Sequence, residues 1–401
     1  MKTVGITAEY NPFHNGHKYH IEESKRISGA DKAVIIMSGS FVQRGEPACA
    51  DKFTRAGWAI DHGADMVLEL PDVFALSCAE RFASGAVRIL AGTGTVDSIC
   101  FGSESGDMEH LKRAALSEGD PEAFCEVMSK GLSYPAALAS SRGDKLTPND
   151  ILGAEYIRAV KKYCPETEIF TVKREGSGYS DDELGGEYSS ANAIRKAFGQ
   201  YSAEYRMSPA VFEGLERALP RDVLEGISAL VKKGAFPAGV SALSDVLLYR
   251  FRAMSADEIA DLPEISEGLE NLYKEHSLDS SDFSEMLSRI KSKRYTMARL
   301  KRISMNALLG VTRELQNAAA VDASALYARV LAVKKGSEEL LTLLKERARI
   351  PVVVRSSGRN DLPELAAKLE SVSAKAHLIR TLGQPYEKDA RPDSSYRLIV
   401  R

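Results

Sequence analysis

The sequence predicts an α/β protein: a parallel, doubly wound sheet, then a helical region and a small C-terminal α/β unit. Three observations lead to this prediction. Short apolar runs alternate with amphipathic stretches from residue 3 to residue 173, which is typical of βαβ units. Strand-like runs then vanish between residues 203 and 320. They return between residues 327 and 355, where the pattern is strand, helix, strand.

The N-terminal strands are predicted from short runs rich in β-branched and apolar residues. They cover residues 3–8, 33–39, 66–71, 96–104 and 168–173, and Pro71 ends the third run. Between them we expect helices at residues 15–28, 50–62, 77–91 and 151–163, where apolar side chains recur at helical spacing. Strands separated by helices in this way form parallel sheets.

The change in pattern along the chain predicts three domains. Residues 1–200 would form the sheet domain, residues 201–325 a helical domain, and residues 326–401 a small C-terminal α/β unit. At 401 residues the chain is long enough for more than one core.

Composition and charge exclude several classes of protein. The chain is 44% hydrophobic and 27% charged, which is ordinary for a globular protein, and its net charge is −3, so nucleic-acid binding would need a local basic patch. The five cysteines are widely spaced without a CxxC pair, which argues against a disulfide framework or a zinc site and favours a reducing cytosol. There is no apolar leader and no window of about eighteen apolar residues, so we expect neither a signal peptide nor a membrane span.

The stretch YNPFHNGHKYH, residues 10–20, is the strongest candidate for a functional site. It follows the first predicted strand and opens the first predicted helix, where parallel sheets bind ligands and where free main-chain N–H groups suit phosphate. His14 and His17 are three residues apart and would share a helix face, donating hydrogen bonds to phosphate oxygens as charge builds on them. Gly16 would let a flat base lie against the main chain. The arrangement suits attack on the α-phosphate of ATP with pyrophosphate leaving.

Other interpretations of these histidines stay open at this point. His14 and His17 could bind zinc, although no third ligand is nearby in the sequence. One of them could act as a general base, or both could merely cap a helix. His20 is expected to be a surface or packing residue.

The segment NPFHNGH resembles the HIGH signature of the nucleotidyltransferase superfamily, whose fold is Rossmann-like. SSANAIRK, residues 189–196, is similar to a second element of that superfamily, which would bring Ser189, Ser190 and Arg195 to the ATP phosphates. Further stretches resemble the family of bacterial tRNA(Met) cytidine acetate ligases. They are GSFVQRGEPA (39–48), DMVLELP (65–71), FGSESGD (101–107), PNDILGAEYI (148–157), KREGSGY (173–179) and KRYTMARLKRISMNALLG (293–310).

This resemblance implies a two-step reaction. Acetate would be activated with ATP to acetyl-adenylate and pyrophosphate, and the acetyl group would pass to the exocyclic amine of the wobble cytidine in elongator tRNA(Met). The substrates would be ATP, acetate and the tRNA, and Mg²⁺ is inferred from the ATP chemistry. His14 and His17 would be catalytic.

The resemblance also implies which residues bind ATP. They are a continuous segment after the first strand and five residues elsewhere: Ile6, Thr7, Ala8, Glu9, Tyr10, Asn11, Pro12, Phe13, His14, Asn15, Gly16, His17, Lys18, Tyr19, Gly102, Asn149, Arg174, Ser190 and Arg195. A glycine at a strand end leaves room for adenosine, an asparagine can form hydrogen bonds with the edge of a base, and an arginine can bind phosphate. Asp150 and Ser180 depart from the residues that the resemblance leads us to expect.

Residues 289–302, RIKSKRYTMARLKR, form a basic run without an acidic residue. We predict a helix there, with Tyr295 placed to stack on an unpaired RNA base. The pattern alone also fits a solvated helix face with Met297 and Leu300 packed inward. With the resemblance, RNA contact is favoured through Arg289, Lys293, Arg294, Arg299 and Arg302.

Two competing functions remain at this stage. An adenylyltransferase that makes a dinucleotide coenzyme would share the N-terminal chemistry but would need little of the chain beyond the first domain. A non-catalytic RNA-binding protein on the same scaffold would not need the HNGH segment, Gly102, Asn149, Arg174 and Arg195 together.

Overall fold

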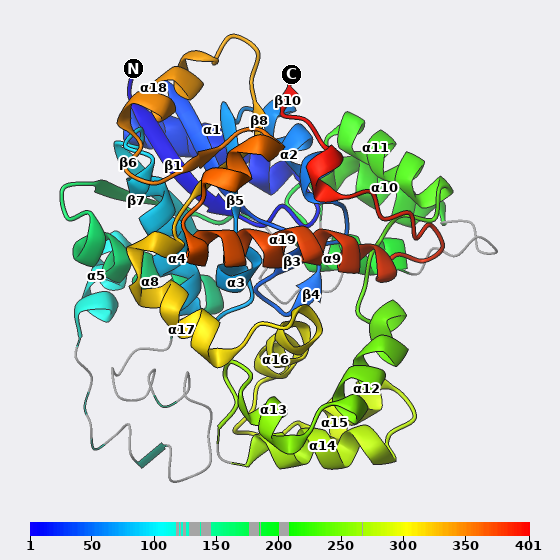
Figure 1. The fold of residues 1–401 in the computed structure, drawn as a ribbon. Coiled ribbons are helices and arrows are strands. Elements are labelled where there is room, and N and C mark those ends of the chain that lie inside the picture. Colours follow the sequence, from blue (N-terminus) through cyan, green and yellow to red (C-terminus); the bar gives the residue numbers. More distant parts are fainter. Residues whose placement is uncertain are drawn as a thin grey trace.

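The computed structural model describes most of the chain. The described residues are 1–117, 146–175, 186–199, 208–266 and 268–401, with Asp120, Glu122, Glu126, Val127, Ala137 and Leu184. Figure 1 shows helices on both faces of a central sheet, with a cluster of helices below it.

The N-terminal elements include the five predicted strands and the four predicted helices, each to within a few residues, and several short elements that were not predicted. They are β1 (Thr3–Ala8), α1 (Asn15–Ser28), β2 (Lys32–Ser38), β3 (Phe41–Val42), β4 (Glu46–Pro47), α2 (Lys52–Asp61), β5 (Met66–Leu70), α3 (Asp72–Ala75), α4 (Ala79–Gly92), β6 (Ser98–Ser103), α5 (Met108–Leu116), α8 (Pro148–Tyr163), β7 (Glu168–Lys173) and α9 (Ala191–Gly199).

The main sheet has the order β10-β8-β5-β2-β1-β6-β7. From β5 to β7 all neighbours are parallel. The chain fills the sheet outward from β1 to β2 and β5, then crosses to β6 and β7 on the other side. The strand order therefore reverses between β1 and β6, which is where open parallel sheets bind ligands.

Alternate side chains of β2 enter two separate cores, because successive residues of a strand point to opposite faces. Val34 and Ile36 pack in one core with α4 and α8, and Ile35 packs in the other with α1 and α2. Both faces of the parallel strands are thus covered, which explains the continuous apolar run that predicted this strand.

The region after α9 is helical, as predicted. Its elements are α10 (Pro209–Ala218), α11 (Arg221–Lys232), η1 (Ser241–Leu243), α12 (Ser244–Ala253), α13 (Ala256–Ala260), α14 (Leu269–Asp279), α15 (Phe283–Ile290), α16 (Met297–Leu309), α17 (Arg313–Val321) and η2 (Ala323–Ala325). Apolar residues of α10 and α11 join the core on the α1 side of the sheet, whereas those of α12 and α14–α16 join the other core. No described helix is long and apolar enough to cross a membrane.

The C-terminal part extends the same sheet. Its elements are β8 (Ala328–Val333), α18 (Glu339–Arg347), β9 (Val352–Val353), η3 (Ser356–Asp361), α19 (Glu364–Leu382), η4 (Asp393–Ser395) and β10 (Ile399–Val400). β8 and β9 are parallel, as the predicted strand-helix-strand unit requires, and β8 pairs antiparallel with β5. The predicted fold class is confirmed, and the three domain boundaries stay a prediction.

Arg55 of α2 joins the ends of the two central strands. Its side chain is fully buried. Nη1 donates to the carbonyl oxygens of Glu9, at 2.6 Å, and Ser38, at 3.1 Å. Nε and Nη2 donate to the carbonyl oxygens of Ala50 and Gly39. Burial lowers the pKa of Arg55 to about 10, so the guanidinium stays charged at neutral pH.

We predict that Arg55→Met lowers the free energy of unfolding by about 3 kcal/mol or more, since each buried carbonyl left without a donor costs about 1–3 kcal/mol. Urea titration followed by the fluorescence of Trp58, which lies in the same helix, measures this change. Arg221→Met is the control, because that exposed side chain pairs with Glu225 on its own helix and its loss should change stability by about 0.5 kcal/mol at most. Equal effects of the two substitutions would contradict the role of Arg55.

Candidate active site

A cavity lies at the carboxyl ends of β1, β6 and β7, beside the point where the strand order reverses. The beginnings of α1, α8 and α9 and the turn between β3 and β4 complete its wall. The residues that line it are Thr7, Ala8, Glu9, Tyr10, Asn11, His14, Gly16, His17, Tyr19, His20, Val42, Gln43, Arg44, Phe82, Phe101, Gly102, Asn149, Leu152, Tyr156, Val172, Lys173, Arg174, Glu175, Tyr188, Ser189, Ser190, Ala191, Asn192 and Arg195. The sheet thus brings together residues that are far apart in the sequence.

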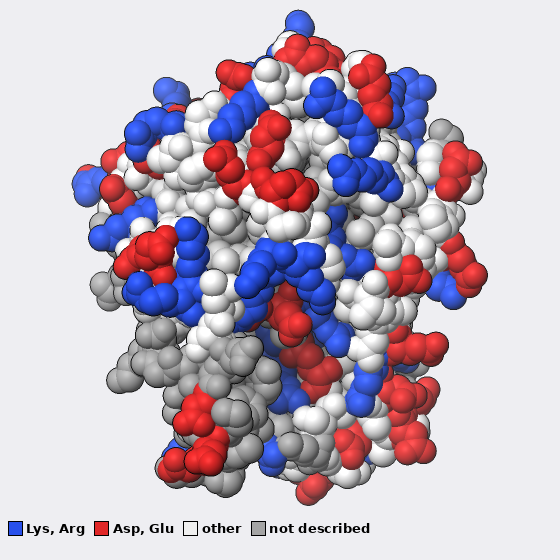
Figure 2. All heavy atoms as spheres, turned by 90° about the vertical axis from the view of Figure 1, so that its left-hand side faces the viewer, with Lys and Arg blue, Asp and Glu red and all other residues white. Residues whose placement is uncertain are grey.

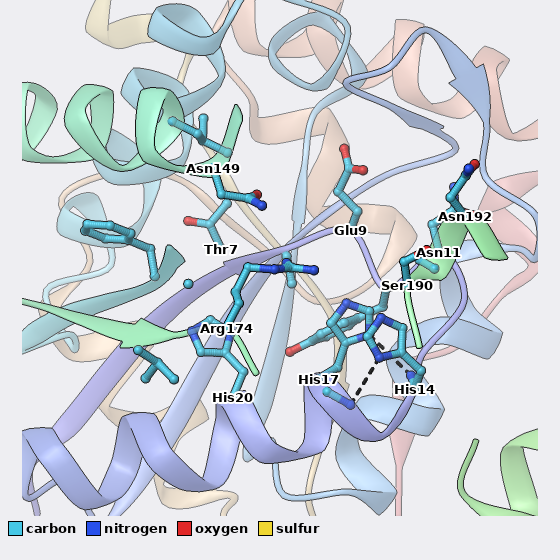
Figure 3. Close-up of a pocket in the computed structure, with 18 of the residues that line it drawn as sticks. Thr7, Glu9, Asn11, His14, His17, His20, Asn149, Arg174, Ser190 and Asn192 are labelled. Carbon is cyan, nitrogen blue, oxygen red and sulfur yellow. Dashed lines mark hydrogen bonds between the residues drawn. The ribbon is translucent and has the colours of Figure 1, made fainter. Parts of the chain in front are cut away.

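His14 and His17 cap the first turn of α1 (Figure 3). Nδ1 of His14 accepts the main-chain N–H of Gly16 at 3.1 Å, and Nδ1 of His17 accepts the N–H of His14 at 3.3 Å. A ring nitrogen that accepts a hydrogen bond carries no proton, so in the neutral imidazole the proton is on the other nitrogen. The hydrogen-bond network therefore assigns an Nε2–H donor to each ring.

Both histidines are neutral at physiological pH. Burial, with Arg174 and Arg195 nearby, lowers the pKa of His14 to about 3. Burial also lowers the pKa of His17 well below its usual value, and a charge on His14 would lower it further. The two rings stack with their centroids 3.7 Å apart, a geometry that two imidazolium ions would not tolerate. The site consequently offers two fixed, uncharged donors.

Gly16 lines the cavity and also makes room for a capping side chain. A Cβ atom at Gly16 would lie 3.0 Å from Cε1 and 3.1 Å from Nδ1 of the His14 ring. The absent side chain makes room for the capping ring, and a flat ligand is not needed to explain it. His20 also differs from the prediction of a surface or packing residue, since it lines the cavity and its buried Nε2 has no hydrogen-bond partner among the described residues. Burial lowers the pKa of His20 to about 4.

One end of the cavity suits an adenosine. Asn149, at the start of α8, donates from Nδ2 to Oε1 of Glu104 at 2.6 Å, which leaves its Oδ1 as an acceptor. Gly102 of β6 lies below the side chain of Arg174, where a Cβ atom would meet Cγ of Arg174 at 3.5 Å. Phe101 and Tyr156 add aromatic surface. These two were missed, because apolar residues within a strand and a helix carry no sign of a ligand.

The other end of the cavity gathers donors. Nη1 of Arg195 donates to the main-chain oxygen of Asn11 at 2.6 Å, which ties α9 to the segment after β1. Ser190 caps α9, accepting the N–H of Ala193 at 3.0 Å. Arg174 follows β7, and in Figure 3 its side chain extends from that strand into the cavity. Guanidinium groups and helix starts at one end of a cavity are typical of phosphate sites.

Five residues of the predicted ATP-binding set do not line the cavity: Ile6, Pro12, Phe13, Asn15 and Lys18. Ile6 and Phe13 are core residues with no exposed surface. Nδ2 of Asn15 donates to the main-chain oxygen of Arg217, and Lys18 is exposed on α1. The set included the whole of residues 6–19, and some residues of that segment face the core or the surface instead of the cavity. The other members line it, and their roles in binding stay predictions.

Two further positions departed from the expected pattern. Asp150 is buried, and its Oδ1 accepts the main-chain N–H groups of Glu104 at 3.1 Å and Ser105 at 3.3 Å. It therefore holds the turn that carries Glu104, which in turn orients Asn149. Ser180 lies outside the described residues.

The basic run 289–302 is not one helix, which corrects the prediction. α15 ends at Ile290 and α16 begins at Met297, so Lys293, Arg294 and Tyr295 lie in the connection. Thr296 caps α16 with its side chain, which is why the helix restarts there. Tyr295 is only 6% exposed, and the Arg299 guanidinium lies 5.3 Å from its ring centre, so Tyr295 is not presented to an RNA base.

Three of the five predicted RNA-contacting residues have acidic or main-chain partners within the protein. Arg289 pairs with Asp279 and Glu285. Arg302 forms a bidentate salt bridge with Glu264, and Arg299 donates to the main-chain oxygen of Glu264. Lys293 is exposed. Figure 2 shows Lys and Arg side chains around a hollow in the middle of one face, with Asp and Glu side chains among them.

No metal centre built from the protein is evident in the part of the chain that the structure describes. No group of three or more His, Cys, Asp or Glu side chains there could hold a metal ion. This finding disfavours the zinc interpretation of His14 and His17, since Nδ1 of each ring is already used by the main chain. The capping interpretation is correct, and it leaves the Nε2–H donors for a ligand.

Comparisons with known proteins agree with this geometry. Residues 1–393 match the family described as HIGH Nucleotidyl Transferase. A tRNA(Met) cytidine acetate ligase of Acetivibrio thermocellus is 38% identical, covering 92% of each chain, and one of Fervidobacterium nodosum is 35% identical, covering 92% of this chain and 88% of that one. The crystal structure of Thermotoga maritima TmcAL bound with alpha-thio ATP matches all of both chains with a TM-score of 0.89 and 31% identity. The chain therefore belongs to the HIGH nucleotidyl transferase family and, within it, to the tRNA(Met) cytidine acetate ligases.

Proposed function

We propose that this protein is an ATP-dependent ligase that acetylates the exocyclic amine of the wobble cytidine of elongator tRNA(Met). Acetate and ATP first give acetyl-adenylate and pyrophosphate, and the acetyl group then passes to the tRNA. The observation that carries the proposal is the pair of Nε2–H donors of His14 and His17, held by the start of α1 in a cavity that also contains Arg174 and Arg195. Family membership over nearly the whole chain supports it.

In the first step a carboxylate oxygen of acetate attacks the α-phosphorus of ATP. The bond to the bridging oxygen breaks, and pyrophosphate leaves with the electron pair. Negative charge grows on the phosphate oxygens, and fixed donors placed at that position lower the barrier because they need no reorganisation. The neutral imidazoles donate without a proton transfer, while the two arginines supply positive charge. Mg²⁺ enters as a complex with ATP, since it prefers phosphate oxygens and water to an all-protein cage.

Asn149 and Gly102 would hold the adenosine. Glu104 fixes the amide of Asn149 so that Oδ1 is the free acceptor, which matches an amino group on the edge of adenine. A coenzyme-forming adenylyltransferase is the weaker alternative, because the relatives named for acetate ligation match the helical region as well as the first domain. We expect the reaction to take place in the cytoplasm, where tRNA is found.

The direct test is acetylation of RNA. The protein is incubated with ATP, labelled acetate and elongator tRNA(Met), and the digested RNA is analysed by mass spectrometry. The proposal requires acetylcytidine at the wobble position and one AMP released per acetyl group. Formation of a dinucleotide with no labelled RNA would overturn it.

We predict that His14→Asn keeps the helix cap but loses the proposed catalytic donor. Asparagine is a preferred N-cap residue, so its Oδ1 can replace Nδ1 while the Nε2–H donor is lost. Acetate-dependent ATP–pyrophosphate exchange should fall by about 10²- to 10³-fold, as for loss of one fixed donor, with the melting temperature nearly unchanged. His110→Asn, on α5 outside the cavity, should leave the exchange rate as it is. Normal exchange in His14→Asn would show that this ring is only a cap.

The connection between α15 and α16 gives a second prediction. Lys291 and Lys293 are exposed there, and neither has a carboxylate partner among the described residues. If they contact phosphates, Lys291→Ala with Lys293→Ala should raise the Kd for tRNA and lower the slope of log Kd against log salt by about 1–2.

Exchange without RNA should not change in this double variant. Lys368→Ala is the matched control, since that lysine is exposed on α19 and pairs with Glu364. An unchanged salt slope would place the RNA contacts elsewhere.

A further inference from the structure

The cavity contains a carboxylate that the first reaction step does not use. Of the residues that line it, only Glu9 and Glu175 are acidic, and Glu175 is exposed whereas Glu9 is partly buried. Glu9 follows the last residue of β1, at the centre of the sheet, and its Oε1 accepts the main-chain N–H of Gln43 at 2.7 Å. In Figure 3 its carboxylate lies apart from the stacked rings of His14 and His17, between Thr7 and Asn149 on one side and Asn192 on the other.

The second step needs a proton acceptor. When the cytidine amine attacks the acetyl carbon, the N–C bond forms, the C–O bond to the phosphate breaks, and AMP leaves with the electron pair. The attacking nitrogen carries two hydrogens and must lose one of them as a proton, because the neutral amide product has a single N–H. In the proposed binding mode, the Glu9 carboxylate lies between the residues assigned to adenosine and those assigned to phosphate, where the acetyl group of acetyl-adenylate would be held.

His14 and His17 are poor candidates for that acceptor. Each Nδ1 is engaged by a main-chain N–H, and each Nε2 already carries a proton. His20 offers an unpartnered Nε2, but it belongs to the second turn of α1, and Arg174 further disfavours its protonation. Burial raises the pKa of Glu9, an effect that Arg44, Arg195 and Arg55 partly oppose, and this shift makes its carboxylate a stronger base at neutral pH.

The turn between β3 and β4, which binds the Glu9 side chain, also contacts α16 in the basic run. Gln43, which binds Glu9, belongs to the turn between β3 and β4, and its main-chain oxygen accepts Nη1 of Arg302 at 3.4 Å. Gly45 in the same turn packs so closely on α16 that an added Cβ would lie 2.4 Å from the main-chain nitrogen of Arg302. An RNA loop bound near α16 would therefore reach the cavity on the side of Glu9.

We propose that Glu9 is the catalytic base of the second step, which takes the proton from the exocyclic amine of cytidine as the acetyl group is transferred. This inference rests on the proposed function of the same cavity. It assigns the two steps to different groups: the histidines and arginines serve adenylate formation, and the carboxylate serves transfer.

The test is Glu9→Gln, which keeps an acceptor for the N–H of Gln43 but removes the basic carboxylate. Two rates are measured in the full-length protein: acetate-dependent ATP–pyrophosphate exchange without RNA, and single-turnover acetyl transfer to saturating elongator tRNA(Met). We expect transfer to fall by about 10²- to 10⁴-fold, the usual contribution of a general base, and exchange to fall far less than transfer. Glu109→Gln is the control, because that exposed side chain lies on α5 outside the cavity, and it should leave both rates unchanged.

Three results would overturn the inference. They are normal transfer in Glu9→Gln, an equal loss of exchange and transfer in the folded variant, and the same selective loss in Glu109→Gln. If Glu9→Gln does not fold, Glu9→Asp replaces it. That variant withdraws the carboxylate by one methylene, so it should slow transfer selectively, and an equal effect on both rates would again refute the role. Failure of wild type to exchange at all would instead refute the proposed function.

Discussion

The buried guanidinium of Arg55 is the interaction on which the site depends. It binds main-chain oxygens at the ends of β1 and β2 and in the segment before α2, so it fixes the edge of the sheet from which the cavity is built. One of those oxygens belongs to Glu9, whose side chain lines the cavity. The residue that joins these strand ends therefore also fixes the main chain of Glu9, for which a catalytic role is proposed.

The start of α1 combines helix capping with the proposed catalytic donors. A helix start has main-chain N–H groups that need acceptors, and here His14 and His17 provide them. Because this bonding uses Nδ1 of each ring, it also places the proton on Nε2. The two Nε2–H donors are therefore already held in position before a ligand binds. The buried, positively charged surroundings keep both rings neutral. Charge comes from Arg174 and Arg195, which reach the cavity from β7 and α9.

Much of this was predictable from the sequence. Periodicity located β1, β2, β5, β6 and β7, but not the short strands β3 and β4. The signal was clearest for β2 and β5, whose residues are buried on both faces. The HNGH segment was placed at the right strand end. Long-range pairing was not predictable. Nothing local indicates that β8 joins β5 antiparallel, or that Arg302 and Glu264 pair across the fold. The basic run therefore looked like one exposed helix, although a cap at Thr296 breaks it and several of its charges are neutralised internally.

The measurement that tests this account most directly is ATP–pyrophosphate exchange by the wild-type protein without RNA, with and without acetate. The account predicts exchange that depends on acetate, because the donors around the α-phosphate complete the first step without the tRNA. Exchange that needs no acetate, or that requires a phosphorylated coenzyme precursor in its place, would contradict the assignment of this cavity to acetate activation.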